Sequence, residues 1–207
     1  MISASKPIRF ASLLIGLSSL AATLILVLIR EPIPGTDGSY VSTSWALLRY
    51  FTILTNFIVS YVLIKAAIRG HWTSFGLLTA STLWISLVGI IYHRMLAGDH
   101  NPTGLAALTN HIHHSVVPLG TFLIWLLCRP RGFIKSSAPF YWLIFPLCYT
   151  AYMVFRAELL NDQYPYPFSD PTLIGWPKFW ITQIVLTLIF LGLGFVIRAA
   201  SNALPRG

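Results

Sequence analysis

The sequence predicts an all-α membrane protein with six transmembrane helices and with both termini on the cytoplasmic side. Of its 207 residues, 56% are hydrophobic and 10% are charged, and its mean hydropathy of +0.71 is too high for an ordinary soluble domain. Six apolar stretches approach or reach the roughly 20 residues that cross about 30 Å of hydrocarbon. Basic and acidic residues fall on opposite sides of these stretches. Each span is expected to be helical, because lipid cannot satisfy backbone N–H and C=O groups.

The first three spans are predicted at residues 10–29, 44–64 and 72–92. Pro, Gly, Asn, Asp or basic residues bound each of them and cap or break helices. The first span is longer than the apolar region of a signal peptide and lacks a small-residue cleavage site after it, so we expect it to remain as a helix. Trp72 and Tyr92 mark the ends of the third span, since amphipathic rings favour the membrane interface.

The last three spans are predicted at residues 109–128, 140–155 and 179–197. Pro118 and Pro146 are expected to kink the fourth and fifth spans. The fifth span is short, and we expect it to extend toward Leu159. No connection exceeds about 20 residues, so residues 1–207 are predicted to form one transmembrane domain without a soluble module.

The distribution of charge predicts the orientation, because short cytoplasmic loops carry an excess of Lys and Arg. One side carries basic residues without any acidic residue: Lys6, Arg9, Lys65, Arg69, Arg129, Arg131, Lys135, Arg198 and Arg206. The opposite loops carry all six acidic residues: Glu31, Asp37, Asp99, Glu158, Asp162 and Asp170. The basic side is therefore expected to be cytoplasmic. The compact loops favour a bacterial inner membrane over a eukaryotic endomembrane.

Composition also excludes two classes of feature. The formal net charge of +8 does not indicate nucleic-acid binding, because the basic residues are scattered over juxtamembrane loops rather than clustered on a soluble module. Cys128 and Cys148 lie within predicted spans, so we expect no disulfide. The expected surroundings are membrane lipids, and the sequence does not indicate an oligomeric state.

Polar residues gather in the outer half of the spans, where they are costly unless they pair or face a cavity. On the second predicted span, helical spacing places three of them on one face: Arg49, Thr52 and Asn56. On the fourth, the same spacing aligns Asn110, His111 and His114. His113 is expected to point elsewhere. The sequence therefore predicts a polar pocket in the outer half of the membrane.

A hydroxyl group becomes nucleophilic when a base within hydrogen-bond reach takes its proton. A rise of 1.5 Å per residue places Thr52 about 12 Å and His114 about 7 Å below the starts of their spans, within bridging distance. Asn110, a backbone carbonyl or a second histidine would orient the imidazole, since the spans offer no carboxylate. Arg49 or Asn56 would stabilise an oxyanion or bind a carboxylate. Purely structural roles are the alternative, since membrane threonines commonly bond the i−4 carbonyl and arginines snorkel.

Three short motifs resemble a known family, the six-span androgen-induced and androgen-dependent TFPI-regulating proteins and their bacterial relatives. The motifs are Tyr50-Phe51-Thr52, Asn110-His111-Ile112-His113-His114-Ser115 and Tyr166-Pro167-Phe168. They resemble the family's aromatic-Thr pair in helix two, its Asn-His-x-x-His-Thr block and its Tyr-Pro-Phe element, with Ser115 in place of the block's Thr. In that family the Thr and the second His are the nucleophile and base of a hydrolase of fatty acid esters of hydroxy fatty acids. The resemblance implies these roles for Thr52 and His114.

Together, these observations predict an intramembrane ester hydrolase that needs no cofactor or metal and acts on a lipid ester from the outer leaflet. His114 would act as general base and then as general acid. The candidates for binding substrate or stabilising an oxyanion are Arg49, Asn56, Asn110 and His111, and residues 164–168 are a candidate lid. His113 remains an alternative base, although the helical phase favours His114.

Rival hypotheses remain open at this point. A zinc-dependent membrane hydrolase would use His93, His111 and His114, because three imidazoles and an open position form a catalytic zinc site. A haem binder or a transporter of a small anion would use the same pocket without catalysis. An assembly subunit without chemistry would tolerate Thr52→Ala and His114→Ala apart from effects on stability.

Overall fold

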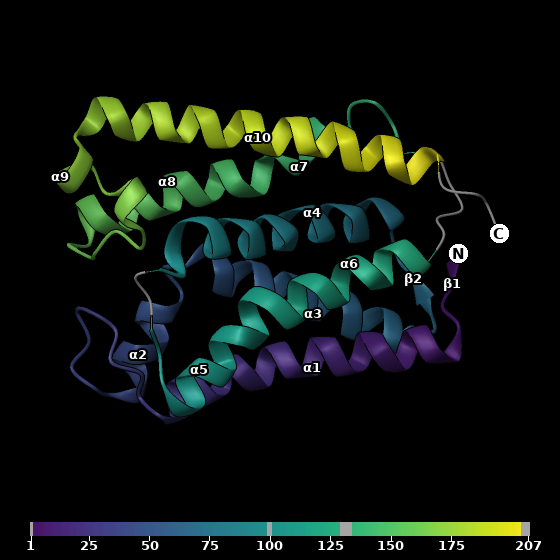
Figure 1. The fold of residues 1–207 in the computed structure, drawn as a ribbon, viewed down its shortest axis with the longest axis horizontal. Coiled ribbons are helices and arrows are strands. Elements are labelled where there is room, and N and C mark those ends of the chain that lie inside the picture. The colour runs from purple at the N-terminus through teal and green to yellow at the C-terminus, as the bar shows by residue number, and fades with distance from the viewer. Residues whose placement is uncertain (1, 99–100, 129–133, 204–207) are drawn as a thin grey trace.

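The computed structural model describes residues 2–98, 101–128 and 134–203, which form an elongated bundle of helices (Figure 1). Within these residues, five helical segments are long and apolar enough to cross a membrane. They are Lys6–Leu28 (α1), Phe51–Arg69 (α3), Phe75–Leu96 (α4 and the turn η1), Ala138–Leu159 (α7 and α8) and Trp176–Ala203 (α10). The prediction of an all-α, multi-pass membrane protein is confirmed at this level.

The fourth predicted span is helical but irregular. It consists of α5 (Gly104–His111), the π-helical turn η2 (Ile112–Val116) and α6 (Val117–Leu127). Pro118 gives the physical reason, because it lacks the N–H that would bond the carbonyl four residues earlier and its ring would clash with that carbonyl. The polar residues at positions 110–115 lower the hydropathy of this segment, which is not among the five.

The second predicted span does not begin at residue 44 as a single helix. A short helix, α2 (Tyr40–Leu47), ends first, and Tyr50 is extended (φ −87°, ψ 128°) before α3 begins at Phe51. Thr52 is therefore the second residue of α3, and its predicted depth of about 12 Å below the start of the helix is wrong. The predicted helix face shared by Arg49 and Thr52 is also wrong, because Arg49 lies in the break between the two helices.

The fifth predicted span extends to Leu159, as expected. It starts as α7 (Ala138–Trp142), is interrupted at Leu143 and continues as α8 (Ile144–Leu159). Pro146 is the third residue of α8, where a helix has no need of the missing N–H. The interruption thus lies ahead of the proline rather than at a kink around it.

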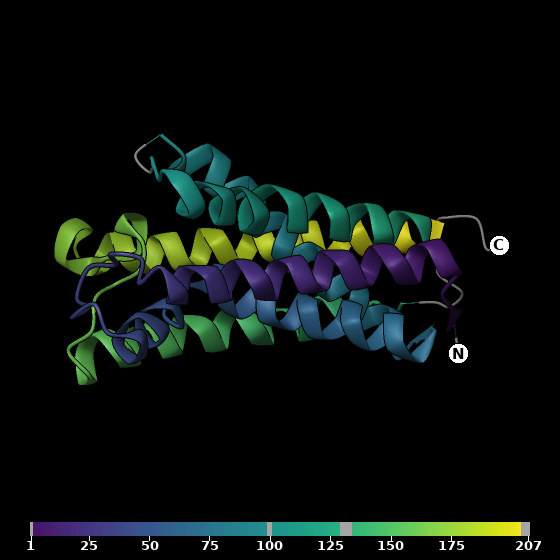
Figure 2. The ribbon, with the colours of Figure 1, turned by 90° about the horizontal axis from the view of Figure 1, so that it is seen from below.

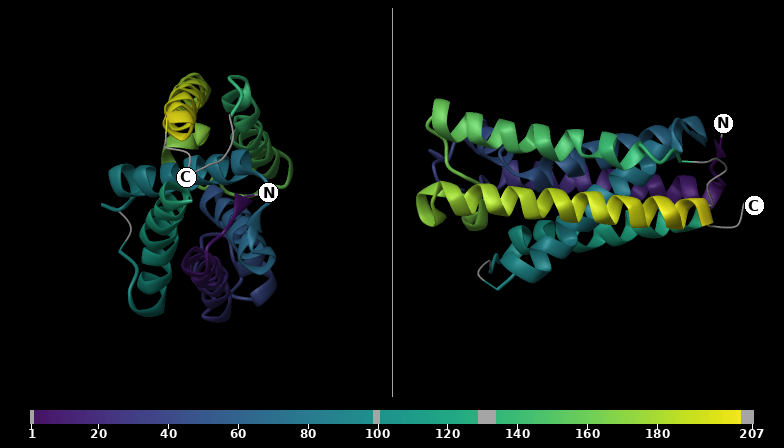
Figure 3. Two further views of the ribbon diagram at one scale, coloured as in Figure 1. Left: turned by 90° about the vertical axis from the view of Figure 1, so that its right-hand side faces the viewer. Right: turned by 90° about the horizontal axis from the view of Figure 1, so that it is seen from above.

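Helix α4 (Phe75–Ile91) occupies the centre of the bundle. Seen end-on, it separates α8 and α10 on one side from α1, α3 and the α5–α6 segment on the other (Figure 3). In the apolar stretch of α4 72% of the residues are buried, compared with 11% in α10. Leu78 and Ile85 of α4 and Val117 of the α5–α6 segment are completely buried in this core.

The two ends of the bundle differ. The first and last described residues, Ile2 and Ala203, lie at one end (Figures 1 and 2), where β1 (Ile2–Ser3) pairs antiparallel with β2 (His71–Trp72). At the other end lie α2, the start of α5, the 3₁₀ turn η3 (Pro167–Ser169) and α9 (Pro171–Ile174). Four residues of the predicted charge pattern lie outside the described residues: Asp99, Arg129, Arg131 and Arg206.

Candidate active site

Thr52 lies in the first turn of α3, whose N-terminal end points toward the end of the bundle that carries α2 and α9 (Figure 1). The carbonyl of Tyr50 accepts hydrogen bonds from the N–H groups of Ile53 (3.1 Å) and Leu54 (3.2 Å). The N–H of Thr52 precedes this regular pattern, and the helix dipole places partial positive charge around it. The hydroxyl of Thr52 therefore sits beside backbone donors suited to a developing negative charge.

His114 is oriented to act as a base toward Thr52. Its Nδ1 lies 3.1 Å from the carbonyl oxygen of Asn110, and its Nε2 lies 3.4 Å from Thr52 Oγ1. A carbonyl oxygen only accepts hydrogen bonds, so Nδ1 carries the proton and Nε2 presents its lone pair to the hydroxyl. A distance of 3.4 Å is typical of a site without substrate, which tightens during the reaction.

Tyr92, the first residue of η1 (Tyr92–Leu96), fixes the plane of this imidazole. The two rings stack with centroids 3.9 Å apart and planes 17° apart. The side-chain amide of Asn110 donates a hydrogen bond to the Tyr92 hydroxyl (2.6 Å). Asn110 thus positions His114 twice, through its carbonyl oxygen and through Tyr92.

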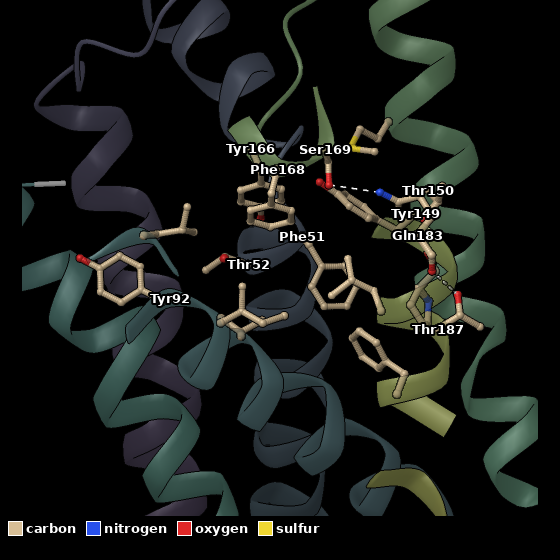
Figure 4. Close-up of a pocket in the computed structure, with 17 residues that line it drawn as sticks. Phe51, Thr52, Tyr92, Tyr149, Thr150, Tyr166, Phe168, Ser169, Gln183 and Thr187 are labelled. Atoms are coloured by element: carbon tan, nitrogen blue, oxygen red, sulfur yellow. Dashed lines mark hydrogen bonds between the residues drawn. The ribbon is translucent and has the colours of Figure 1, made fainter. Parts of the chain in front are cut away.

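Tyr166 reaches Thr52 from the segment between α8 and α9. Burial raises the pKa of its phenol to about 12, although hydrogen bonds with the hydroxyl and backbone N–H of Thr52 act in the opposite direction. Tyr166 and Phe168 stack on each other and cover the Thr52 side of the site (Figure 4). The phenol therefore remains a neutral hydrogen-bond donor at physiological pH.

Thr52 lines two cavities at once. The outer cavity, of about 550 Å³, is also lined by His114, Asn110 and residues of the loop after α1. The inner cavity, of about 80 Å³, extends from Thr52 between α4, α8 and α10 and is largely apolar (Figure 4). Tyr92, Tyr166 and Phe168 line both. A substrate with two arms can therefore place its reactive centre at Thr52, with one arm in each cavity.

Arg49 takes part in an ion cluster that we call the outer clasp, formed by Arg49, Arg156 and Asp162. Arg49 Nη1 lies 3.0 Å from Asp162 Oδ1, and Arg156 Nη2 contacts the other carboxylate oxygen. Arg49 also donates to the carbonyl of Pro34 (2.6 Å) and is 3% exposed. It is not among the described residues that line the two cavities, so its geometry gives it a structural role beside the site.

Asn56 and His113 form a buried layer below Thr52. The Asn56 amide donates to the Thr52 carbonyl (2.9 Å), and its Oδ1 accepts from Ser19 (2.9 Å). Nε2 of His113 lies 3.3 Å from the Ser19 carbonyl and 3.1 Å from Thr23 Oγ1. Because the carbonyl only accepts, this Nε2 carries a proton and faces away from Thr52. The geometry thus favours His114 over His113 as the base.

The π-helical turn changes which histidines share a face. His113 and His114 both line the outer cavity, whereas His111 is exposed, so the predicted common face of His111 and His114 is wrong. His93 bonds to Ser115 (3.0 Å). Within the described part of the chain, no three His, Cys, Asp or Glu residues are grouped so that they could hold a metal. The predicted zinc set of His93, His111 and His114 is therefore not assembled.

Comparison with protein-family models, curated proteins and solved structures finds no match for this chain. Function is therefore inferred from the geometry around Thr52. That geometry adds roles the sequence did not predict. Tyr92 was expected only as an interfacial ring, and the contact of Tyr166 with Thr52 depends on a loop without periodicity. Gln183 was not singled out, although a glutamine within an apolar span was an available signal.

Proposed function

We propose that this protein is an intramembrane ester hydrolase with Thr52 as the nucleophile and His114 as the general base. One observation carries the proposal: Thr52 Oγ1 faces the lone-pair nitrogen of an imidazole whose other nitrogen is bonded to the Asn110 carbonyl, at the junction of two cavities. A nucleophile, a base and a group that orients the base are the common elements of nucleophilic acyl transfer.

In the first step, Nε2 of His114 takes the hydroxyl proton as Thr52 Oγ1 attacks the ester carbonyl. The imidazolium then gives this proton to the departing alcohol, which leaves an acyl group on Thr52. In the second step, His114 takes a proton from water, the resulting hydroxide attacks the acyl carbonyl, and the fatty acid leaves as Thr52 regains its proton. His114 thus acts alternately as base and acid.

Two donors are suited to the oxyanion of each tetrahedral intermediate. The backbone N–H of Thr52 lies at the positive end of α3, and the phenol of Tyr166 contacts the same residue. Both groups lie at Thr52 before the substrate binds, and the oxyanion would replace the Tyr166 oxygen as the acceptor of the Thr52 N–H. Asn56 positions Thr52 through its carbonyl, and Arg49 holds the loop that carries Tyr166 through Asp162.

The substrate class follows from the two cavities and from the resemblance of the three motifs to the six-span family. We assign the apolar inner cavity to the acyl chain and the larger outer cavity to the alcohol part of a lipid ester, of the type formed between a fatty acid and a hydroxy fatty acid. The outer cavity, with 21 lining residues that include Glu31 and Asn110, is suited to admit the water that completes the reaction.

In this proposal the chain crosses a bacterial inner membrane six times, with the α5–α6 segment as the fourth span. The positive-inside distribution of Lys and Arg supports cytoplasmic termini, so the site would face the outer leaflet. A C-terminal green fluorescent protein fusion should fluoresce, whereas a C-terminal alkaline phosphatase fusion should be inactive. The reverse pair of results would contradict this orientation.

The test of the chemistry is intact-mass analysis after treatment with a small fluorophosphonate. We expect one adduct on the wild type, because an activated hydroxyl displaces fluoride from phosphorus. Thr52→Ala and His114→Ala should both abolish it. Thr55→Ala, a buried threonine one turn along α3, is the matched control and should label normally. A folded wild type that stays unlabelled, or a Thr52→Ala variant that still labels, would remove the basis of the proposal.

A further inference from the structure

A third cavity lies on the lipid-facing side of the bundle, between α8 and α10. This groove has a volume of about 650 Å³ and is lined mainly by aliphatic and aromatic side chains. Glu158 and Trp180 lie toward the end where α8 finishes and α10 begins, whereas Leu147 and Leu188 lie deeper. The groove therefore runs along the direction of a lipid chain, with a carboxylate at one end.

Three residues line both this groove and the inner cavity: Thr150, Gln183 and Thr187. Their side chains lie across the inner cavity from Thr52 (Figure 4), and the same residues line the groove. Thr150 donates to the Gln183 side-chain oxygen (3.1 Å), and the Gln183 amide donates to Ser169 Oγ (3.2 Å). A polar partition that is one layer of side chains thick thus separates the two spaces.

The size of the inner cavity requires a further space for any long substrate. At about 80 Å³ it is well below the roughly 300–1,000 Å³ of small-molecule sites, so it holds only the part of an acyl chain nearest the ester. The groove on the other side of Gln183 supplies the additional volume for the rest of the chain. A chain that occupies both must pass between α8 and α10.

The α10 wall of the groove is exposed on the lipid-facing side. Ile184 and Leu188 are 59% and 61% exposed, and α10 is the least buried of the five candidate spans. The bonds of Gln183 are neutral, and the amide can exchange a protein acceptor for an ester carbonyl without burying a charge. Opening the partition therefore requires side-chain movements rather than the breaking of an ion pair.

We propose that the groove between α8 and α10 is the lateral entrance and binding site for the acyl chain of a membrane lipid ester, with Gln183 as its gate. This inference rests on the proposed ester hydrolase activity. The ester reaches Thr52 sideways from the bilayer, and the chain end remains in the groove during the reaction. The outer cavity serves water and the alcohol product instead.

The test compares two fluorophosphonates, one with a long alkyl chain in liposomes and one short and water-soluble. Ala151→Trp fills the groove from a residue that lines it and not the inner cavity. We expect labelling of Thr52 by the long probe to slow about ten-fold or more and labelling by the short probe to stay within about two-fold. Ile189→Trp, at an exposed α10 residue outside the groove lining, is the matched control and should affect neither. Equal effects of Ala151→Trp on both probes would overturn the entrance.

A second variant is expected to increase labelling by the long probe relative to the short one, a result that misfolding would not produce. Gln183→Leu removes both hydrogen bonds of the gate, so the ratio of the long-probe to the short-probe labelling rate should rise above that of the wild type. Slower labelling by the long probe with normal labelling by the short probe would show that Gln183 is not a gate. A loss of labelling by both probes would also contradict the proposal.

A photoreactive fatty acid with a diazirine near its carboxyl group, the part expected to lie in the inner cavity, separates this inference from the hydrolase itself. Irradiation should attach it to the α4 peptide that contains Val88, which lines the inner cavity and is buried from lipid. Ala151→Trp should suppress this adduct and Ile189→Trp should not. Persistence of the Val88 adduct in Ala151→Trp would overturn the entrance, whereas adduct formation without any fluorophosphonate labelling would overturn only the hydrolase.

Discussion

The two sides of Thr52 differ in how closely their helices pack. On one side, a Cβ added at Gly89 of α4 would lie 3.0 Å from the carbonyl oxygen of His114. On the other side, α10 is the least buried of the five candidate spans, and Gly192 on its exposed face has no neighbouring atom within 4 Å of its Cβ position. The first side carries the base, its orienting carbonyl and the stacked Tyr92, whereas the second borders the lipid-facing groove.

The difference indicates how one small bundle can combine fixed chemistry with access from the bilayer. The proposed acyl transfer requires a geometry held within fractions of an ångström, and the packed side of α4 and η2 is suited to this. The proposed entry of an acyl chain requires α8 and α10 to separate, and the exposed groove lies between these two helices. Thr52 lies where the two requirements meet.

The largest effect is expected from Asp162→Asn, which tests whether the outer clasp holds α8 against the packed side of Thr52. Asp162 neutralises Arg49 and Arg156, whose side chains are 4% and 1% exposed. Its loss leaves two buried cations without a counter-charge, and we expect a loss of about 3–5 kcal/mol in the free energy of unfolding. Thermal unfolding in detergent measures it.

The matched control for this prediction is Asp170→Asn. Asp170 caps α9 by accepting from the Thr172 N–H (2.8 Å), and asparagine caps helices about as well as aspartate. The control should therefore leave the melting temperature almost unchanged. If Asp162→Asn also unfolds at the wild-type temperature, the outer clasp does not hold the two sides together.

The next largest effect is expected at Tyr166, which reaches Thr52 from the segment between α8 and α9. Tyr166→Phe should slow labelling about 10²-fold, since loss of one oxyanion donor has an effect of that size. Because the phenol pKa is raised to about 12, the wild type keeps this donor at pH 10 and loses it only as the pH rises through 12. The labelling rate of the wild type should therefore not fall between pH 7 and pH 10 through loss of this donor. A fall in the wild type that is absent in Tyr166→Phe would contradict the prediction.

Tyr164→Phe is the control on the same segment. Its hydroxyl donates to Glu158 (2.8 Å) and does not line the two cavities of Thr52 in the described structure. Labelling of this variant should match the wild type. Equal losses in both variants would mean that the segment, rather than the phenol of Tyr166, is what matters.

The same contrast explains how much could be predicted from the sequence. Hydropathy predicted the five long apolar helices, because lipid imposes length and apolarity on each spanning helix. The pairing of Thr52 with His114 was expected, and the structure brings the two side chains together, although Thr52 lies in the first turn of α3 and not at the depth from which the pairing was predicted. Both predictions depend on properties that are local in the chain.

The misplaced features depend on departures from regular helix. The predicted helix face of Arg49 and Thr52 ignored the break at Leu48–Tyr50, and the shared face of His111 and His114 ignored the π turn before Pro118. Each of these departures changes the 3.6-residue period of the helix, so every later side chain is rotated about the helix axis. Proline at position 118 was a visible signal that the period would change.

A smaller effect is expected from a pair of glycine substitutions on the two sides. Gly89→Ala places a methyl group against the His114 carbonyl and Pro118, and we expect a loss of about 1–2 kcal/mol together with slower labelling as His114 shifts. Gly192→Ala should be neutral or stabilising by up to about 1 kcal/mol, because alanine favours helix over glycine. Equal effects at the two positions would remove the contrast in packing.

The smallest effect is expected at His111, whose exposure distinguishes a π-helical turn from a regular α-helix. In the structure His111 is exposed, so His111→Ala should change stability by less than about 0.5 kcal/mol and leave labelling intact. A regular helix would instead place His111 beside His114, and the substitution would then impair the site. His113→Ala is the contrast, because it removes a 2% exposed ring bonded to Thr23 and should cost about 1–3 kcal/mol in stability. Impaired labelling in His111→Ala would favour a regular α-helix at this position, in which His111 shares a face with His114.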